Sequence, residues 1–289
     1  MTKLKKSDVI VEIPVEEKGN FKKIIKVYRK KFIRNSESLV NEVFTENKPL
    51  IKDLKAGKAS EVIEKAREFV WKKYLIEEEV FNTNLLTDLG ILLETPKNIL
   101  DGILKEGLDS RKLVGRYAGR VFPYIYELSL SNTNSRRSRS GSVFQYIIYR
   151  VYGELGYNFD SQKKVGKKIF SDAKLGKIVD SVLPGIKEFE EKRSKTIIGT
   201  MKTSLRERWQ EVVEEIQRTG IPQIFLLTVD NEISQEKAEK MGRHNVTLVV
   251  PERLTKITPI KEMKNIISFE EYLFKEIPST ISYWKNIED

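Results

Sequence analysis

The sequence contains no cysteine, and His244 is its only histidine. Disulfides, thiol nucleophiles and Cys/His zinc sites therefore have no side chains from which to form, and a Ser-His-Asp triad would have to use His244. Long hydrophobic runs are missing too, since the longest, IFLLTV at 224–229, has the length of a strand and not of a membrane span. Any chemistry must consequently use carboxylates, lysine, tyrosine or a hard metal ion.

The start of the chain lacks the pattern of a secretory signal. MTKLKKSDVIVEIPVEE begins with basic residues, but its apolar stretch is short and is interrupted by acids. Together with the absence of long apolar runs, this predicts a cytoplasmic protein with no membrane partner.

The composition is that of a folded protein with an excess of positive charge. The 289 residues are 39% hydrophobic and 9% aromatic, which is typical of a globular chain that forms one large domain or two smaller ones. Lysine and arginine number 52 against 42 acids, giving a net charge of +10 and a pI near 9.4. A polyanionic partner is plausible, although many basic proteins bind none.

Residues 19–130 show apolar positions at spacings of three and four, which predicts helices. Ser60, and Thr95 followed by Pro96, are typical helix starts. We expect an all-helical N-terminal module at 1–130, with four or five helices that include the stretches FKKIIKVYRKKF, SEVIEKAREFVWKKYLIEEEVF, TPKNILDGILKEGL and SRKLVGRYAGRVFPYIYELSL.

The polar stretch SNTNSRRSRSGS at 131–142 interrupts this periodicity and predicts a junction loop. A helix is expected to follow it and to end at Gly153 and Gly156. One face of this helix carries four apolar residues, Phe144, Ile147, Ile148 and Val151.

The pattern changes after this helix. Four β-rich runs bounded by Gly, Pro or Asn are KIVDSVLPG (177–185), SKTIIGTMK (194–202), PQIFLLTVD (222–230) and NVTLVVPERL (245–254). Helical patterns at 204–219 and 234–242 separate the later runs. The order predicts an α/β domain at 131–289, with a mixed β-sheet flanked by helices.

Asp180 lies within the first of these runs, and Lys202 ends the second. A buried acid is unfavourable unless it is paired or binds a metal, so Asp180 is either a water-facing residue of an edge strand or part of a site. If the two strands pair, Asp180 and Lys202 converge at one end of the sheet. A metal ligand would then lie beside an ammonium that can activate water or neutralise phosphate.

The helix predicted at 204–219 offers a second carboxylate. Its apolar stripe is flanked by Glu215, whereas Glu214 points away from it. Glu215 could reach toward Asp180 and Lys202 as a second Mg²⁺ ligand, or it could be an ordinary charged flank.

Arg206, Glu207 and Arg208 lie in the first turn of the same helix. Arginine donates twice to guanine and glutamate accepts from cytosine, so these side chains could read G·C pairs. Alternatively, Glu207 closes a capping box with Ser204. Arginine near a helix N-terminus is unfavourable for the helix dipole, which favours another use for Arg206 and Arg208.

Two basic segments could contact phosphates or could be solvated surface. The segment SRRSRS contains Arg136, Arg137 and Arg139. The segment KKVGKKIFSDAKLGK contains Lys163, Lys164, Lys167 and Lys168.

Together, these residues resemble type II restriction endonucleases with the PD-(D/E)XK nuclease fold, in the branch that reads CCGG or CC and GG flanking a short centre. That branch has a catalytic acid, a lysine two residues after Ser or Thr, and then a glutamate. Asp180, Lys202 after Thr200, and Glu215 reproduce this order, with separations of 202 − 180 = 22 and 215 − 202 = 13 residues.

The resemblance covers roughly residues 131–255 and is most specific in KTSLRERW, which is similar to the family's lysine and recognition helix. It implies that Asp180 and Glu215 bind Mg²⁺, that Lys202 assists the attacking water, and that the arginine, glutamate and arginine of this octet read bases. Two positions depart from the family. Gln145 stands where a supplementary glutamate is expected, and Val179 replaces the proline before the catalytic acid.

The resulting hypothesis is a sequence-specific, Mg²⁺-dependent double-strand DNA endonuclease of a restriction-modification system, acting on a palindromic site with a CC/GG core. A palindrome implies at least a homodimer. In this hypothesis Arg137 and Arg139 also contact DNA. Two alternatives stay open: a structure-specific repair nuclease with the same fold, and a non-catalytic DNA-binding regulator in which Asp180 and Lys202 form a structural ion pair.

Overall fold

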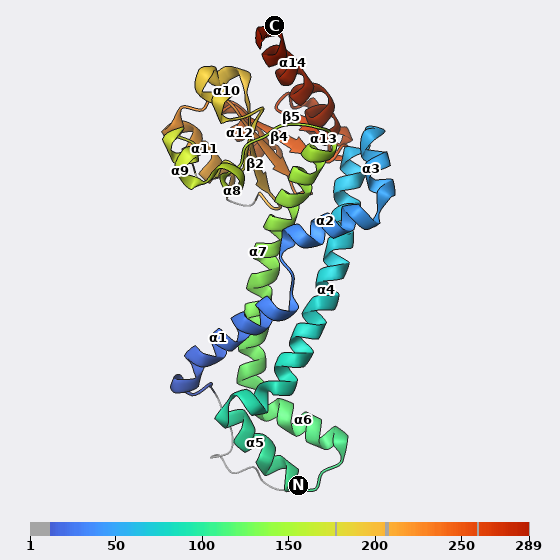
Figure 1. Ribbon diagram of the computed structural model, residues 1–289, viewed down its shortest axis with the longest axis vertical. Helices are drawn as coiled ribbons and strands as arrows, with labels where there is room; N and C mark the ends of the chain where they lie inside the picture. The colour runs from blue at the N-terminus through green and yellow to red at the C-terminus, as the bar shows by residue number, and fades with distance from the viewer. Residues whose placement is uncertain (1–11, 177, 206–207, 259, 289) are drawn as a thin grey trace. The chain divides into compact units, whose positions relative to one another are not determined.

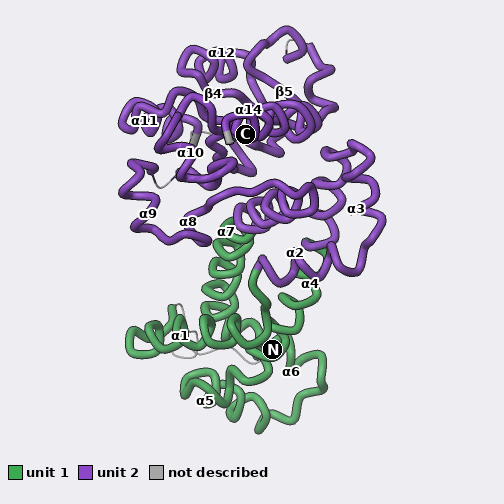
Figure 2. Tube along the Cα trace, turned by 45° about the horizontal axis from the view of Figure 1, so that its top comes forward, with its two compact units in different colours: residues 1–35, 71–139 green, residues 36–70, 140–289 purple. Residues whose placement is uncertain are grey.

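The computed structural model describes residues 12–176, 178–205, 208–258 and 260–288, with Arg208 and Glu288 as backbone only. The chain forms two compact units, which Figure 2 colours separately. Unit 1 comprises residues 1–35 and 71–139, and unit 2 comprises residues 36–70 and 140–289. Within the described residues, no helix is both long and apolar enough to cross a membrane.

The helices account for most of the elements. Those before the sheet are α1 (Val15–Phe32), α2 (Ser36–Glu46), α3 (Lys48–Lys55), α4 (Ala59–Leu92), α5 (Glu94–Leu104), α6 (Ser110–Arg120), α7 (Phe122–Glu154), α8 (Gln162–Val165) and α9 (Lys167–Asp172). Those among and after the strands are α10 (Ile186–Glu191), α11 (Arg208–Thr219), α12 (Gln235–Arg243), α13 (Phe269–Glu271) and α14 (Ile277–Glu288). Three short 3₁₀ segments are η2 (Arg193–Lys195), η3 (Leu254–Lys256) and η4 (Ile260–Glu262), and the π-helical segment η5 (Tyr272–Glu276) joins α13 to α14. The predicted helical character of the N-terminal half is confirmed.

Unit 1 is held together by polar contacts between helices as well as by its apolar core. The carboxylate of Glu17 accepts hydrogen bonds from the main-chain N–H of Thr95 (2.9 Å) and from the hydroxyl of Tyr124 (2.6 Å). Glu78 is 2% exposed and is paired with Arg136 and with the hydroxyl of Tyr74. These contacts hold α4 against α7, because the loss of Arg136 would leave the buried charge of Glu78 uncompensated.

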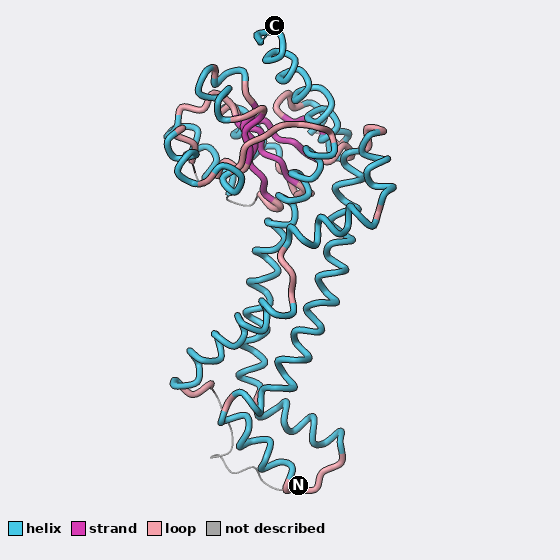
Figure 3. The backbone as a smooth tube through the Cα atoms, in the orientation of Figure 1, coloured by secondary structure: helices cyan, strands magenta, loops and turns pink. Residues whose placement is uncertain are grey.

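Unit 2 is built on a sheet whose strands appear in magenta in Figure 3. The sheet has the order β1-β2-β3-β4-β5, formed by β1 (Ser181–Leu183), β2 (Ile197–Lys202), β3 (Ile224–Thr228), β4 (Val246–Val250) and β5 (Ile266–Ser268). β1 is antiparallel to β2, and the other neighbours are parallel. α11 and α12 form the crossovers between β2, β3 and β4 (Figure 1). The predicted α/β fold with a mixed sheet flanked by helices is confirmed.

Apolar side chains cover both faces of this sheet. On one face, Leu226 belongs to a core that includes Val212 of α11. On the other face, the ring of Phe225 lies 5.3 Å from that of Tyr272, whose hydroxyl is 2.8 Å from that of Tyr152 in α7. Successive residues of a strand point to opposite faces, so this alternation fixes the C-terminal part of α7 against the sheet.

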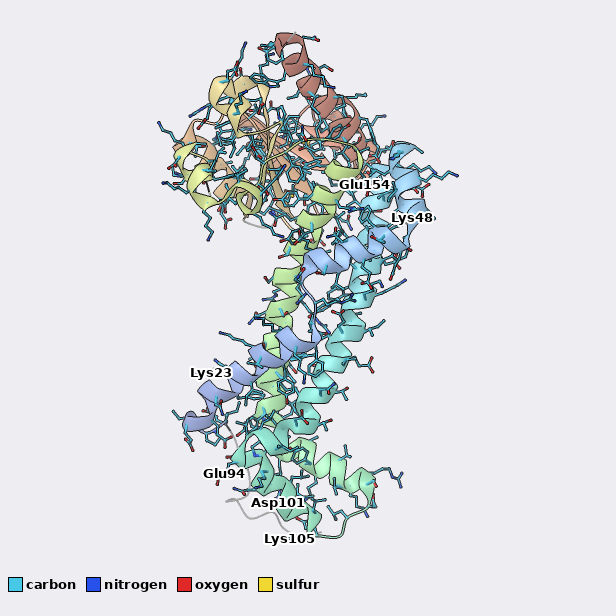
Figure 4. All side chains as sticks on the ribbon, viewed as in Figure 1. Lys23, Lys48, Glu94, Asp101, Lys105 and Glu154 are labelled. Carbon is cyan, nitrogen blue, oxygen red and sulfur yellow. The ribbon has the colours of Figure 1, made fainter. Side chains whose placement is uncertain are left out.

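The end of α7 agrees with the sequence, whereas its middle does not. The four residues of the predicted apolar face are fully buried, and Gly156 follows the helix with a φ of 73°. Glu154, labelled in Figure 4, pairs with Arg150 at 2.5 Å in the last turn. The stretch 131–142, predicted as a junction loop, is instead part of α7, which runs without a break from Phe122.

Distant polar partners explain why residues 131–142 are helical without an apolar stripe. Asn132 accepts a hydrogen bond of 2.8 Å from Arg29, and Arg136 binds Glu78. Side chains that are paired across helices need no apolar contacts to be held in place. The predicted domain boundary between residues 130 and 131 stays a prediction. The two compact units describe how the chain packs, and they do not test which residues form the nuclease domain.

Smaller differences concern the boundaries of the elements. α4 begins at Ala59, and the hydroxyl of Ser60, predicted as a helix start, instead donates to Glu270 at 2.7 Å. α5 begins at Glu94, one residue before the predicted Thr95. α10 and β5, which are both short, have no counterpart among the elements predicted from the sequence. β1 begins at Ser181, so Asp180 directly precedes the strand.

Candidate active site

Asp180 is held between the first two strands and α7. Its main-chain N–H donates to the carbonyl of Gly199 at 2.9 Å, which continues the β1–β2 ladder by one residue. Its Oδ2 accepts a hydrogen bond of 2.7 Å from the main-chain N–H of Met201. Its Oδ1 accepts from Nε2 of Gln145 at 3.1 Å. The carboxylate is therefore fixed from two sides, beside the end of β2.

The electrostatics of Asp180 reflect burial opposed by a cation. Burial raises the pKa of this carboxyl to about 6, while the nearby charge of Lys202 and the hydrogen bond from Met201 act to lower it. The hydroxyl of Thr200 adds a long contact of 3.5 Å to Oδ2. The structure thus brings Asp180 and Lys202 together at the end of the paired strands.

A hollow of about 270 Å³ opens beside Asp180. Its lining contains two tyrosines, two lysines and two glutamines, namely Gln145, Tyr146, Tyr149, Gln162, Lys163 and Lys167, together with Val179 and Asp180. Of the predicted phosphate contacts, Lys163 and Lys167 therefore lie beside the candidate catalytic acid. Cations next to a carboxylate in an open hollow suit a polyanionic substrate better than an apolar one.

Glu215 lies in a neighbouring hollow. That hollow shares Gln162 and Lys167 with the first and is also lined by Gly176 and Arg218. Glu215 is 9% exposed, and its Oε1 pairs with the guanidinium of Arg218, which is itself 63% exposed. A Cβ on Gly176 would lie 1.4 Å from this Oε1, so the carboxylate occupies space that only glycine leaves open.

The donor set is compatible with Mg²⁺ at Asp180. Among the described residues, no three acidic or histidine side chains are grouped as a metal site. Mg²⁺ does not need three, because it usually keeps several waters and binds through one or two carboxylates plus substrate phosphates. An ionised carboxylate has about four acceptor positions, and the bonds from Met201 and Gln145 leave Asp180 with free lone pairs. Glu215 pairs with Arg218 through Oε1, which leaves Oε2 as the oxygen that it could offer a metal.

The predicted base-reading residues are placed only in part. Arg206 and Glu207 lie outside the described residues, and Arg208 is described only as the first residue of α11. Just before them, the main-chain N–H of Leu205 donates to the carboxylate of Asp230 at 2.7 Å. This bond anchors the chain between the end of β2 and the start of α11.

The arginines of the SRRSRS segment have different surroundings, all within unit 1. Arg139 donates to the main-chain carbonyl of Arg34 at 2.7 Å, and its guanidinium lies 5.1 Å from the ring centre of Tyr74. Arg136 is bound to Glu78, whereas Arg137 is exposed. Arg139 is thus already used inside the protein, and the roles of Arg137 and Arg139 in DNA binding stay predictions.

Several neighbours of the site were not identified from the sequence as part of it, among them Tyr149, Gln162, Gly176 and Arg218. A signal existed for Tyr149, which follows Gln145 by one helical turn and therefore shares its face. Arg218 is likewise three residues after Glu215. No sequence signal connects Gly176 with Glu215, because their proximity depends on tertiary packing.

Comparison with known proteins gives consistent matches. The sequence model of a family described as EcoRII C terminal matches residues 112–273. The type II restriction enzyme SsoII of Shigella sonnei is 31% identical over 257 residues, which are 88% of this chain and 81% of SsoII. Metal-depleted Ecl18kI in complex with uncleaved DNA is 30% identical with a TM-score of 0.78, covering 93% of this chain and 86% of Ecl18kI. The PspGI-substrate DNA complex, 17% identical with a TM-score of 0.60 and coverage of 87% and 94%, shows a shared fold.

Proposed function

This chain belongs to the EcoRII C-terminal family of type II restriction endonucleases, and we propose that it cleaves a palindromic site with a CC/GG core as a Mg²⁺-dependent homodimer. Members of this class are site-specific deoxyribonucleases, so the chain is an enzyme that cuts double-stranded DNA. Family membership disfavours the non-catalytic regulator, and it favours base readout over recognition of DNA structure.

The observation that carries the proposal is the position of the Asp180 carboxylate at the end of β2, where it accepts from the main-chain N–H of Met201 and lies within the field of Lys202. Asp180 would hold Mg²⁺, with Glu215 as a second ligand. Bound Mg²⁺ would polarise the scissile phosphate and lower the pKa of a water molecule. Lys202 would orient the attacking water and stabilise the negative charge that develops on the phosphate oxygens.

Specificity is assigned to the start of α11. Arg206, Glu207 and Arg208 follow the strand that ends in Lys202, so one short segment carries both the catalytic lysine and the base-reading groups. Two arginines and a glutamate suit a G·C pair in the major groove. A palindromic site mirrors a two-fold axis, which supports a homodimer.

The related complexes support a metal requirement and a DNA substrate. The Ecl18kI complexes contain uncleaved DNA and are depleted of metal, and PspGI is bound to its substrate DNA. Mg²⁺ is proposed here because the site offers oxygen ligands only. The cytoplasmic location expected from the sequence stays a prediction.

The test is digestion of a long unmethylated DNA by the purified protein, with Mg²⁺ and with EDTA, followed by sequencing of the fragment ends. Discrete fragments that appear only with Mg²⁺ and share a G·C-rich palindrome are expected. A smear would indicate cleavage without base readout, and intact DNA in both samples would contradict the proposal.

A further inference from the structure

Two residues of α7 hold Asp180 in a closed set of hydrogen bonds. The hydroxyl of Tyr149 donates to the main-chain carbonyl of Asp180 at 2.6 Å. Nε2 of Gln145 lies 2.7 Å from the same hydroxyl and 3.1 Å from Oδ1 of Asp180. Gln145 and Tyr149 are four residues apart on one helix, so both project from the same face toward Asp180.

The chemistry of these groups requires an amide at position 145. A phenol has one proton, and Tyr149 uses it on the carbonyl of Asp180, so its oxygen can only accept from Gln145. The ionised carboxylate of Asp180 also only accepts. The NH₂ group of Gln145 has two protons and satisfies both acceptors, whereas an ionised glutamate has no proton to donate.

Tyr149 is fixed by its surroundings. Its ring stacks on that of Phe159 with centres 4.9 Å apart, and the ring of Tyr146 meets it edge-on at 6.1 Å. Its hydroxyl proton is engaged in the 2.6 Å hydrogen bond to the Asp180 carbonyl. The packing of the ring therefore holds this donor in place.

We propose that Gln145 and Tyr149 are positioning residues for DNA cleavage, which orient the Asp180 carboxylate through the Gln145 amide and the Asp180 main chain through the Tyr149 hydroxyl. This inference rests on the proposed catalytic role of Asp180. Met201 holds Oδ2 from the strand side, and Gln145 holds Oδ1 from the helix side. The remaining lone pairs of the carboxylate are then left for the hollow.

The test compares Gln145→Met, Gln145→Glu and Tyr149→Phe with wild type on a plasmid that carries the site found by fragment-end sequencing. Gln145→Met removes both donated protons at similar side-chain length, and Tyr149→Phe removes only the hydroxyl and keeps the ring packing. Gln235→Met, on the exposed surface of α12, is the matched control for the glutamine change. Melting temperatures establish that each variant is folded.

We expect Gln145→Met and Tyr149→Phe to lower kcat about 10- to 100-fold, the usual effect of losing a group that orients a ligand residue. KM, and DNA affinity measured in EDTA by fluorescence anisotropy, should stay unchanged, which a general loss of structure would not produce. The loss of kcat in the double variant Gln145→Met/Tyr149→Phe should be smaller than the product of the two single losses, because both residues act on Asp180. Gln145→Glu should lose as much activity as Gln145→Met.

Wild-type kcat in folded Gln145→Met or Tyr149→Phe would overturn the positioning role. Gln145→Glu with equal or higher kcat would also overturn it, because position 145 would then accept a carboxylate in place of a donor. If Gln145→Met does not fold, Tyr149→Phe decides alone. Asp180→Asn is assayed in parallel: its inactivity beside a fully active Gln145→Met rejects only the positioning role, whereas an active Asp180→Asn rejects the proposed site itself.

Discussion

Replacing Asp180 by asparagine should remove a pH-dependent loss of stability while abolishing cleavage. Burial raises the pKa of Asp180 from 3.8 to about 6, so the folded protein holds this proton more tightly than the unfolded chain does. A raised pKa means that the group's contribution to stability is fully present below pH 3.8 and is lost as the pH rises through 6. Asparagine carries no charge at any of these pH values and escapes the loss.

The expected size follows from the difference between the two pKa values. At pH 8 the carboxyl of Asp180 is ionised in both the folded and the unfolded protein. A difference of about two pKa units, at about 1.36 kcal/mol each, then destabilises the folded wild type by about 3 kcal/mol. At pH 5 the folded carboxyl is mostly protonated, and the same calculation gives about 1.5 kcal/mol. The unfolding free energy of Asp180→Asn relative to that of the wild type should therefore increase by about 1.5 kcal/mol between pH 5 and pH 8. Changes in hydrogen bonding at the amide are independent of pH and cancel in this difference.

The assay is urea denaturation in EDTA at constant ionic strength, followed by the fluorescence of the three tryptophans. Asp172→Asn, on the exposed surface of α9, makes the same chemical change away from the site and should alter stability by no more than about 0.5 kcal/mol. A difference in unfolding free energy between Asp180→Asn and wild type that is equal at the two pH values, or more favourable to Asp180→Asn at pH 5, would contradict the raised pKa of Asp180.

Three further substitutions test other parts of the site. Lys202→Ala should abolish cleavage and leave specific DNA binding in EDTA largely intact, as measured by gel shift; normal cutting would remove Lys202 from the mechanism. Lys167→Ala should weaken DNA binding and reduce the slope of log affinity against log salt by about 1, and its exposed neighbour Lys168, which lines neither hollow, should show a smaller effect when changed to alanine. Similar losses of DNA affinity in the Lys167 and Lys168 variants would mean that Lys167 contributes only to the overall positive charge and makes no specific phosphate contact. Gly176→Ala places a methyl group where the Glu215 carboxylate lies; since a misplacement of 1 Å costs about 100-fold, cleavage should fall by this order with little change in melting temperature, and a wild-type rate would show that the position of Glu215 is unimportant.

Features that depend on local periodicity were predictable from the sequence. Val212 and Val213 are buried and Glu214 is exposed, as the helical stripe of α11 predicts. The order of β2, α11, β3, α12 and β4 also follows from alternating apolar runs and amphipathic stretches. Pairing of the first two strands was enough to predict that Asp180 approaches Lys202, because strands that pair at one end of a sheet bring their neighbouring residues together.

Features that depend on distant partners were not predictable. The polarity of residues 131–142 predicts a loop, yet they are helical because partners far away in the sequence, among them Arg29 and Glu78, bind them. The pairing of Glu215 with Arg218, and its fit against Gly176, likewise depend on packing around the hollow. A single sequence indicates which residues could be in contact, but not which of several charged neighbours a carboxylate pairs with.

The contacts of Asp180 explain how an unfavourable carboxylate is kept in place. Its raised pKa means that the protein is less stable with this group ionised than it would be with a neutral one. Selection for stability alone would remove such a group, whereas metal binding requires the ionised form. The charge of Lys202 and the bond from Met201 oppose the loss by favouring the ionised carboxylate. Met201 donates to it from a strand and Gln145 donates to it from a helix. The same two bonds leave its remaining lone pairs toward the hollow that Lys167 lines, so the arrangement that makes the charge tolerable also directs it at the place where we expect the phosphate.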